Sequence, residues 1–377
     1  MESVCICGEV HLPYQVRWYW PDEGYRKPEM ETYFDQKAIY SRFERVAKET
    51  ICTNHMMKDF LAAGGICSFN ISGTFLDQCK WHTDVIKSFK NLADTGQVEF
   101  MASPYYHSVC SLYSDLSQFN EQVTRHRDTI TDLFGTVPKT FVNSELILSK
   151  SITNSLKKMG FECQISEGSH NVVKEYCPVH VYNSHFPTLL RHIDLSEDLE
   201  LHFSDRTWVG YPLIADKFAS WINDMEGDIV TLYFNYDSIA RHHNNGSYIG
   251  KFMRELPESL ADHGIDMVTP TQAVRRFRTV KLPTLDTEST ARYGMHSLFG
   301  SHAQHLYLQE LMIIGEELQQ IKSTSEYDTL NEIYGCLQQS SILLDMNPEN
   351  FQLAYERAVN NYSILSDLRR AILEVRA

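Results

Sequence analysis

Short apolar, β-branched runs alternate with amphipathic helical patterns over about the first 280 residues of the chain. Apolar residues are continuous within these runs, which is typical of strands that are buried on both faces. Alternation of such strands with helices predicts a parallel sheet covered by helices. We predict strands at residues 4–10, 66–71, 98–102, 140–145, 162–166, 199–204, 229–236 and 266–270.

Helical periodicity fills most of the intervals between these strands. Residues 40–65 carry apolar side chains at three- and four-residue spacing and end at a pair of glycines. Residues 149–160 and 216–227 also end at glycine, a common helix stop. Seven or eight strand–helix units of this size favour a closed or nearly closed α/β barrel over an open sheet.

The pattern changes near the segment "KLPTLDTE", residues 281–288. Residues 290–377 show no strand pattern, and three segments there, 301–323, 326–346 and 350–377, have helical period. Three helices of this length can form a bundle. We therefore predict two domains, a barrel at residues 1–285 and a C-terminal helical domain at residues 286–377 that packs on it.

The net charge and the spacing of the cysteines limit which partners the protein binds and in which cellular compartment we expect it. The net charge is −15, which argues against nucleic acid or an anionic membrane as partner, because a phosphate backbone needs a basic footprint. The chain begins without a signal-peptide pattern, and no apolar run reaches the ~18 residues of a membrane span. Nine cysteines without a C-x-x-C pair predict free thiols, and we expect a cytoplasmic protein.

Polar side chains gather at the ends of four predicted strands, which is where parallel βα folds place functional groups. The candidates are His11, Glu99, Tyr106, His107, Glu145, Asn235 and Asp237. Tyrosines suit a sugar, because a pyranose has an apolar face and a polar rim. Each candidate also has a structural alternative, such as a hydrogen-bonded strand end or a structural ion pair.

Metal and cofactor signals are weak by comparison. His302 and His305 lie three residues apart in a predicted helix, but no third ligand accompanies them. The chain contains no glycine-rich phosphate loop and no G-x-S-x-G motif. We predict neither a metal nor a cofactor.

Five segments, taken in order, resemble the motifs of glycoside hydrolase family 57, the α-glucan-acting amylases. The segments are "GEVHLPY", "VEFMASPYYHSV", "FVNSELILS", "LSEDLELHFSDRTW" and "FNYDSIARHHNNGSYIGKFMRELPESL". The resemblance implies a (β/α)7-type, distorted TIM-like barrel followed by a C-terminal helical bundle. It also implies an α-glucan partner, such as glycogen or maltodextrin.

The same resemblance implies roles for individual residues. Glu145 matches the nucleophile of a retaining mechanism. The implied substrate-binding residues are His11, Glu99, Tyr106, His107, Trp208 and His242. Asn235 stands where the family has its general-acid Asp, and Ser341 and Ile342 replace an Asp-His pair.

These departures leave the activity open. A retaining glycosidase needs two carboxyl groups ~5–5.5 Å apart, and an amide has no proton to donate, so loss of the acid costs roughly 10²–10⁴ in rate. Asp237 is a candidate surrogate, although in an extended strand it lies about 6.6 Å beyond Asn235. The chain is therefore either a hydrolase or transglycosylase with a surrogate acid, or an inactive protein that binds α-glucan or a partner. A metal-dependent deacetylase is a third reading, but it requires a paired Asp and an H-x-x-x-H motif that the chain lacks.

Overall fold

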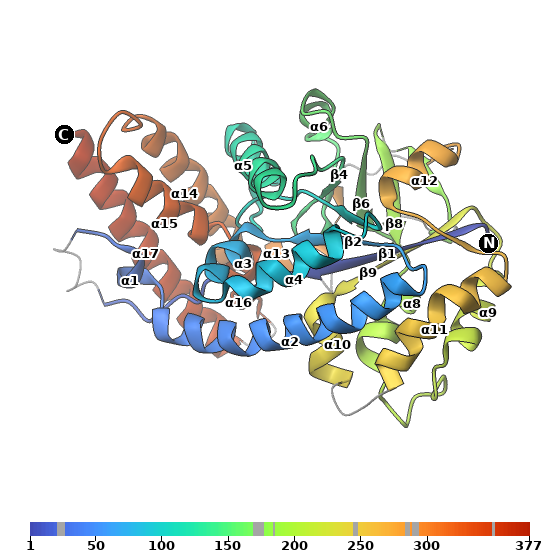
Figure 1. Ribbon diagram of the computed structural model, residues 1–377. Helices are drawn as coiled ribbons and strands as arrows, with labels where there is room; N and C mark the ends of the chain where they lie inside the picture. The colour runs from blue at the N-terminus through green and yellow to red at the C-terminus, as the bar shows by residue number, and fades with distance from the viewer. Residues whose placement is uncertain are drawn as a thin grey trace.

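A nearly closed barrel of parallel strands forms the larger part of the computed structural model (Figure 1). The structure describes residues 1–20, 27–168, 177–183, 185–243, 248–282, 287–288, 294–348 and 351–377. The seven barrel strands are β1 (Ser3–Val10), β2 (Cys67–Ile71), β3 (Val98–Phe100), β4 (Thr140–Val142), β6 (Cys163–Glu167), β8 (Pro187–Arg191) and β9 (Ile229–Asn235). The predicted barrel followed by C-terminal helices is confirmed.

Strand pairing follows the order β3-β2-β1-β9-β8-β6-β4 around the barrel. A single parallel bridge between Ala102 and Phe141 joins the β3 side to β4 and closes the ring. All of these pairings are parallel, so the carboxyl ends of the strands meet at one mouth.

Five shorter strands extend this framework. They are β5 (Leu148–Ser149), β7 (Val181–Asn183), β10 (Asp266–Met267), β11 (Val280–Lys281) and β12 (Thr287–Glu288). Strand β7 pairs antiparallel with β8 and parallel with β11, whereas β10 pairs with the start of β1. Strand β12 pairs with β5, outside the barrel sheet.

Helices cover the outside of the barrel. They are α1 (Met30–Tyr33), α2 (Gln36–Ala62), α3 (Gly73–Gln78), α4 (Thr83–Ala93), α5 (Ser117–Phe134), α6 (Thr153–Lys158), α8 (Ile193–Glu197), α9 (Ala215–Asn223), α10 (Tyr236–His243), α11 (Tyr248–Asp262) and α12 (Pro270–Arg276). Short 3-10 turns are η2 (Cys79–Trp81), η3 (Cys110–Leu112) and η4 (Ser144–Leu146), and η5 (Asp198–His202) is a π-helical turn. Helix α2 begins where the Asp35 carboxylate accepts from the Ala38 amide and ends just before Gly64, whose φ of +95° favours glycine.

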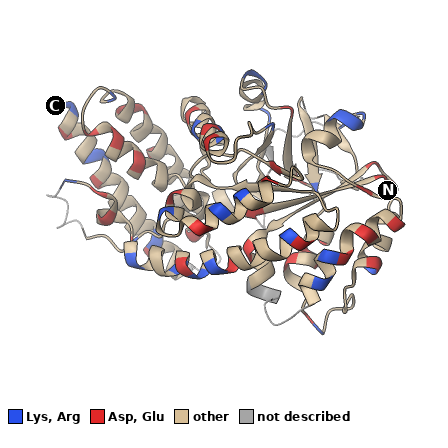
Figure 2. Ribbon diagram, in the orientation of Figure 1, with Lys and Arg blue, Asp and Glu red and all other residues tan. Residues whose placement is uncertain are grey.

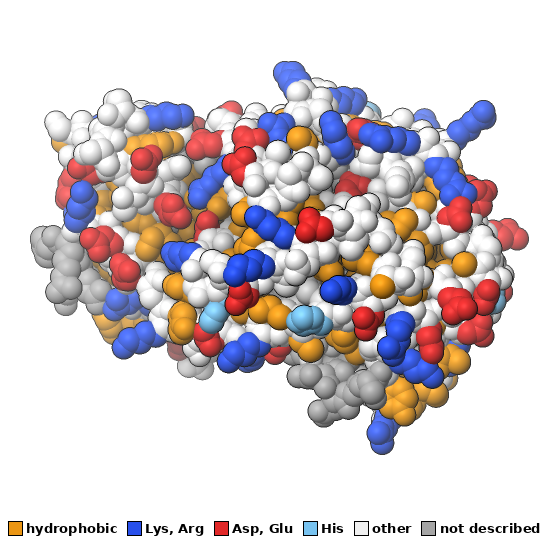
Figure 3. Space-filling model, viewed as in Figure 1, with side chains coloured by type: hydrophobic (Ala, Val, Ile, Leu, Met, Phe, Trp, Pro, Cys, Tyr) orange, Lys and Arg blue, Asp and Glu red, His pale blue; other side chains and the backbone are white. Residues whose placement is uncertain are grey.

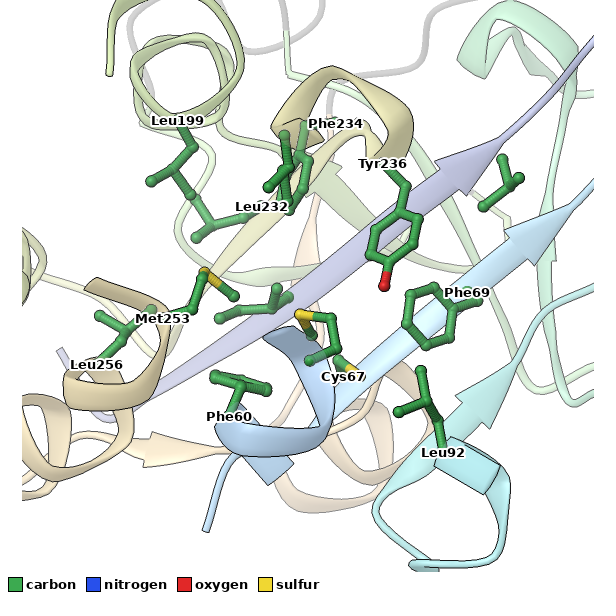
Figure 4. Close-up of a cluster of buried hydrophobic side chains, with 14 of the residues drawn as sticks. Phe60, Cys67, Phe69, Leu92, Leu199, Leu232, Phe234, Tyr236, Met253 and Leu256 are labelled. Atoms are coloured by element: carbon green, nitrogen blue, oxygen red, sulfur yellow. The ribbon is translucent and has the colours of Figure 1, made fainter. Parts of the chain in front are cut away.

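The barrel strands bury both faces, as their continuous apolar runs predict. The outward residues of β1 and β9, such as Ile6 and Leu232, belong to the core beneath the helices. The inward residues Cys7 and Tyr233 belong to a separate core inside the barrel. Figure 4 shows the outer core, in which the ring of Tyr236 meets that of Phe69 edge to face at 5.0 Å.

Within the barrel, one predicted strand is absent and one observed strand was not predicted. Residues 199–204 form part of η5 and the turn after it, because Leu199 and Phe203 are buried four residues apart while Leu201 between them is exposed. The alternation of apolar residues there imitates a strand. Conversely, β8 was not predicted, since its apolar run is short and begins at Pro187.

The C-terminal helices lie at one end of the molecule, shown in orange and red in Figure 1. They are α13 (Met295–Phe299), α14 (His302–Gln319), α15 (Tyr327–Leu337), α16 (Ser340–Asp345) and α17 (Phe351–Arg376). Residues 326–346 were predicted as one helix, but the chain breaks between α15 and α16. Gln339 at the break forms a bridge with Ser108 and accepts a 2.7 Å hydrogen bond from the Tyr14 amide.

The boundary between residues 285 and 286 stays a prediction. Residues 283–286 lie outside the described part of the chain. One hydrophobic core contains residues of both predicted domains, for example Tyr106 and Phe141 together with Leu337 and Leu368. The C-terminal helices therefore share a core with the barrel.

Charges lie mainly on the outer faces of the helices, whereas the central strands carry few (Figure 2). Acidic and basic side chains are interspersed on the face that Figure 3 shows, in keeping with the lack of a basic footprint in the sequence. Across the described ranges, none of the helices is both long and apolar enough to span a bilayer. All nine cysteines are free, which confirms the prediction of free thiols.

Candidate active site

Polar side chains from several strands meet at the carboxyl mouth of the barrel. Glu9 is near the end of β1 and His11 follows that strand, His107 lies in the loop after β3, Glu145 lies in η4 after β4, and Asn235 is the last residue of β9. Parallel strands direct all of these positions to the same end. The structure thus brings four predicted residues and one unpredicted residue to one mouth.

The backbone at Glu145 is unusual. Strand β4 ends at Val142, three residues earlier than predicted, and the Asn143 side chain accepts from the Ser144 amide and donates to the Ile147 carbonyl. Glu145 then has φ of +52°, in the left-handed region that residues with a Cβ rarely adopt. Such strained conformations concentrate at functional sites, since the surrounding structure must enforce them.

The Glu145 carboxylate has two polar partners from distant parts of the chain. Its Oε1 accepts a 2.7 Å hydrogen bond from the Ser340 hydroxyl and lies 3.5 Å from Nε2 of His107. Burial raises the pKa of Glu145, but His107 and Ser340 together outweigh burial and leave this pKa below its usual value. The side chain is 19% exposed. Glu145 is therefore an ionised carboxylate within reach of solvent, as a nucleophile must be.

His107 lies between two carboxylates. Its Nε2 faces Glu145, and its Nδ1 lies 3.8 Å from Oε1 of Glu9. Burial lowers the pKa of His107, but Glu9 and Glu145 outweigh burial and raise it overall. The histidine itself is 3% exposed and has φ of +53°. His107 thus lies buried between the two acids, and Nδ1, the nitrogen nearer Glu9, has no hydrogen-bond partner among the described residues.

His11 packs flat on His107. The two ring centroids are 4.1 Å apart with 20° between the ring planes, and Nδ1 of His11 lies 2.9 Å from the Ser72 hydroxyl. Burial lowers the pKa of His11 well below its usual value, and the charge of His107 adds to this effect. His11 therefore stays neutral beside the charged ring.

Sequence analysis missed Glu9. Its Oε1 accepts from the Tyr233 hydroxyl at 2.9 Å and from Nδ2 of Asn70 at 3.4 Å. Burial raises the pKa of Glu9, and the nearby Glu145 and Glu200 reinforce the rise against the lowering effect of His107. A period-two reading of β1 contained the signal, because Cys5, Cys7 and Glu9 lie on the inner face of the strand.

Asn235 sits at the mouth but is engaged by a neighbouring acid. Its Nδ2 donates to Glu200 at 2.7 Å, and its backbone amide donates to the same carboxylate at 3.2 Å. The strand ends at Asn235 and α10 begins at Tyr236, so the predicted extended geometry for Asp237 was wrong. Asp237 instead lies in the first turn of α10, with 9% of its surface exposed.

Glu99 does not join this cluster. It accepts hydrogen bonds from the hydroxyls of Thr140 at 2.5 Å and Thr271 at 2.6 Å, and from the Thr271 amide at 3.2 Å. Thr140 is the first residue of β4, and α12 follows β10, which pairs with the start of β1. Glu99 is therefore oriented toward the amino end of the barrel.

Three further predicted binding residues lie apart from the cluster or outside the description. Tyr106 is buried, and its hydroxyl accepts from Arg125. Trp208 packs on His202 and on Trp221 of α9. The backbone of His242 lies in α10, but its side chain lies outside the described residues.

The described side chains contain no group of three or more His, Cys, Asp or Glu residues that is arranged to hold a metal ion. Two surface hollows, of about 300 and 660 Å³, are lined by residues of α17, with α15 and α14 respectively. Neither is lined by a member of the cluster at the barrel mouth.

Comparison with known proteins follows this geometry. The sequence pattern of Glycosyl hydrolase family 57 matches residues 5–286. A protein of Methanocaldococcus jannaschii named "Putative alpha-amylase" is 29% identical over 397 aligned residues, which cover 98% of this chain and 84% of that protein.

Two solved structures share this architecture. A GH57-type branching enzyme from Pyrococcus horikoshii superposes with a TM-score of 0.68 at 12% identity, covering 96% of this chain and 88% of that one. The alpha-amylase AmyC from Thermotoga maritima has a TM-score of 0.61 at 10% identity, covering 100% and 94%. At these identities the likeness shows the fold alone.

Proposed function

Because the chain belongs to glycosyl hydrolase family 57, we propose that it hydrolyses or transfers α-glucan chains through a retaining mechanism with Glu145 as nucleophile. The observation that carries this proposal is the state of Glu145, an ionised, partly exposed carboxylate held at a strained backbone position. A structural ion pair needs no left-handed glutamate, whereas a nucleophile must be fixed against the anomeric carbon.

The names of similar proteins support the substrate class. The relative from M. jannaschii carries an alpha-amylase name, and the structural neighbours are a branching enzyme and an alpha-amylase. In such a reaction Glu145 attacks the anomeric carbon, and a covalent glycosyl-enzyme forms before water or a second sugar hydroxyl completes the turnover. His107 and Ser340 would hold the attacking carboxylate in place.

A second candidate function is binding of α-glucan without turnover. It is favoured by Asn235, which we propose stands where other family members have their acid and whose amide donates to Glu200. An amide there holds a sugar hydroxyl but supplies no proton. The two functions differ in whether a carbon–oxygen bond is broken.

An activated aryl α-glucoside separates the two, because a dinitrophenolate leaving group departs without protonation. We expect a burst of dinitrophenolate and a glycosyl adduct on Glu145, detected by intact-mass and peptide spectrometry. Glu145→Gln should abolish both. Absence of adduct and of product, together with saturable binding of maltooligosaccharide, would instead establish the binding protein.

Asn235→Asp tests the proposed site of the missing acid. The new carboxyl would lie beside Glu200, and repulsion between two adjacent carboxylates raises the pKa of one of them, which favours a proton donor at this position. We expect faster cleavage of unactivated maltooligosaccharide than in the natural chain. Asn91→Asp, on the exposed surface of α4, is the matched control and should change nothing.

A further inference from the structure

We propose that Glu9 is the general acid and base of this site, in place of the carboxyl group that Asn235 lacks. The proposal rests on the retaining reaction with Glu145 as nucleophile. The second carboxyl group therefore comes from β1, the strand next to β9, and not from Asp237, which follows Asn235 in the chain.

The strand register places Glu9 where such an acid is needed. Residues Glu9 and Asn235 are direct partners in the parallel pairing of β1 with β9. Cys7 and Tyr233, two residues earlier in each strand, belong to the core inside the barrel, so period two turns Glu9 and Asn235 inward as well. The side chains of Glu9 and Asn235 thus lie at the same level of the barrel, at the mouth end of its inner core.

His107 couples Glu9 to the nucleophile. One ring nitrogen lies 3.5 Å from Glu145 and the other 3.8 Å from Glu9. Two oxygens held on opposite nitrogens of one imidazole are less than ~10 Å apart. This is an upper limit, and the retaining step requires the two carboxyl groups to approach to ~5–5.5 Å around the bound sugar. The Glu9 side chain is 17% exposed and that of Glu145 is 19% exposed, so both face accessible space.

The neighbours of Glu9 suit a group that gives up and recovers a proton. Tyr233 and Asn70 both donate to Oε1, which leaves the second oxygen to carry the proton. Burial, assisted by Glu145 and Glu200, raises the pKa of Glu9, whereas the pKa of Glu145 is lowered. Two carboxyls with pKa values moved in opposite directions are the usual sign of an acid and a nucleophile.

The neighbouring acids fit this role less well. Glu200 accepts two hydrogen bonds from Asn235, one on each carboxylate oxygen, so both of its oxygens are already engaged. Asp237 is turned into the first helical turn of α10 rather than along the strand. Of these three acids, Glu9 is the one that lies beside His107.

The Glu9 carboxyl transfers its proton to the glycosidic oxygen while the bond from that oxygen to the anomeric carbon breaks and Glu145 bonds to the same carbon. In the second half, a water molecule transfers a proton to the Glu9 carboxylate. The oxygen of that water bonds to the anomeric carbon and displaces Glu145. Both carboxyl groups return to their starting states.

Glu9→Gln in the full chain tests the role, with a 2,4-dinitrophenyl α-glucoside and maltoheptaose as substrates. Loss of a general acid should slow maltoheptaose cleavage roughly 10²–10⁴-fold. The dinitrophenolate burst should persist, because that leaving group needs no proton. Azide should then restore turnover of the aryl substrate and yield the α-glucosyl azide, since an anion needs no general base.

Several outcomes would overturn the assignment. An equal loss on both substrates, or no response to azide, would mean that Glu9 only supports the fold of the site. Undiminished maltoheptaose cleavage by Glu9→Gln would reject the assignment directly. If Glu200→Gln or Asp237→Asn instead lost maltoheptaose cleavage and kept the dinitrophenolate burst, that residue would be the general acid. If the natural chain forms neither adduct nor product, the retaining reaction itself fails, and the acid with it.

Tyr233→Phe provides a second test that does not remove the carboxyl group. The Tyr233 hydroxyl bond lowers the pKa of Glu9, so its loss should raise that pKa and move the basic limb of the kcat/KM profile to higher pH. The other charged groups that act on Glu9 are His107, Glu145 and Glu200, and all are retained. An unmoved limb in a folded variant would contradict the proposal. Glu255→Gln, exposed on α11, is the matched control for Glu9→Gln.

Discussion

The barrel holds a partly buried glutamate oriented toward each end, and the two are bound in contrasting ways. Toward the amino end, Glu99 accepts three hydrogen bonds from neutral donors on Thr140 and Thr271. At the carboxyl mouth, Glu145 accepts from the Ser340 hydroxyl and lies 3.5 Å from the imidazole of His107, on a left-handed backbone. Glu99 lies within an apolar strand and Glu145 lies just after one, and the apolar pattern alone does not separate their roles.

The contrast separates a carboxylate that joins elements of the fold from one that we propose is reactive. Neutral donors at Glu99 satisfy the carboxylate and join three elements of the fold, so nothing is left for a ligand to complete. At Glu145 the balance depends on His107, whose charge in turn depends on Glu9. A group whose charge state depends on titratable neighbours is suited to chemistry.

The largest expected effect is on turnover at the mouth. Glu145→Gln should reduce maltooligosaccharide turnover by a factor of ~10⁴ or more, because a catalytic unit loses its nucleophile. Thermal stability should change little, since the amide oxygen still accepts from Ser340. The measurement is single-turnover kinetics beside a melting curve. If Glu145→Gln instead lost much stability and kept its activity, Glu145 would be the structural glutamate, and the contrast with Glu99 would be reversed.

The next effect is on stability, at the amino end. Glu99→Ala removes the acceptor of three donors and should lower the free energy of unfolding by about 1–3 kcal/mol. Urea unfolding measures this change. If Glu99 instead binds glucan, as its place in the motif implies, KM should rise in the folded variant, and the contrast between the two glutamates would be lost.

A pH-dependent effect follows from His107→Asn, in which Asn tolerates the left-handed backbone. The raised pKa of His107 stabilises the natural fold fully below the ordinary histidine value, and this contribution is lost as pH rises through the folded pKa. The variant should therefore be less stable at about pH 6 and approach the natural chain near about pH 9. Urea unfolding at a series of pH values tests this. A difference that grows with pH would mean that His107 is neutral in the fold.

The smallest effect concerns the hydroxyl on Glu145. Ser340→Ala removes a bond that lowers the pKa of Glu145, so this pKa should rise and the acidic limb of kcat/KM should move to higher pH. The rate near neutral pH should fall by roughly 10-fold, because one hydrogen bond to an ionised carboxylate contributes about 1.5 kcal/mol or more. Ser341→Ala, one residue on, is the matched control. Identical profiles in both variants would show that Ser340 does not tune the nucleophile.

Much of the fold could be predicted because its signals are local. Continuous apolar runs identified most barrel strands, and glycine stops identified the ends of several helices. The predictions failed where a local pattern was ambiguous, as at Leu201, whose exposure reveals a helix beneath an alternating pattern. They failed again at Asp237, because apolar periodicity does not show where a strand turns into a helix.

The candidate site was predicted in part. Motif order pointed to Glu145, His107 and His11, which the structure brings together. Glu9 was missed because the analysis followed the histidine after the strand rather than the inner face of the strand itself. Ser340 lies 195 residues from Glu145 and reaches it only through the break between α15 and α16.

The sequence by itself determined the alternation of strands and helices, the family and the identity of the candidate nucleophile, because residue type and spacing along one chain carry that information. The tertiary structure alone decided which acid lies across His107 from Glu145 and which glutamate is directed away from the mouth. Neighbours around a barrel are set by the register between strands and by loop contacts across hundreds of residues. Neither can be read from a single strand, and together they placed His107 between Glu9 and Glu145.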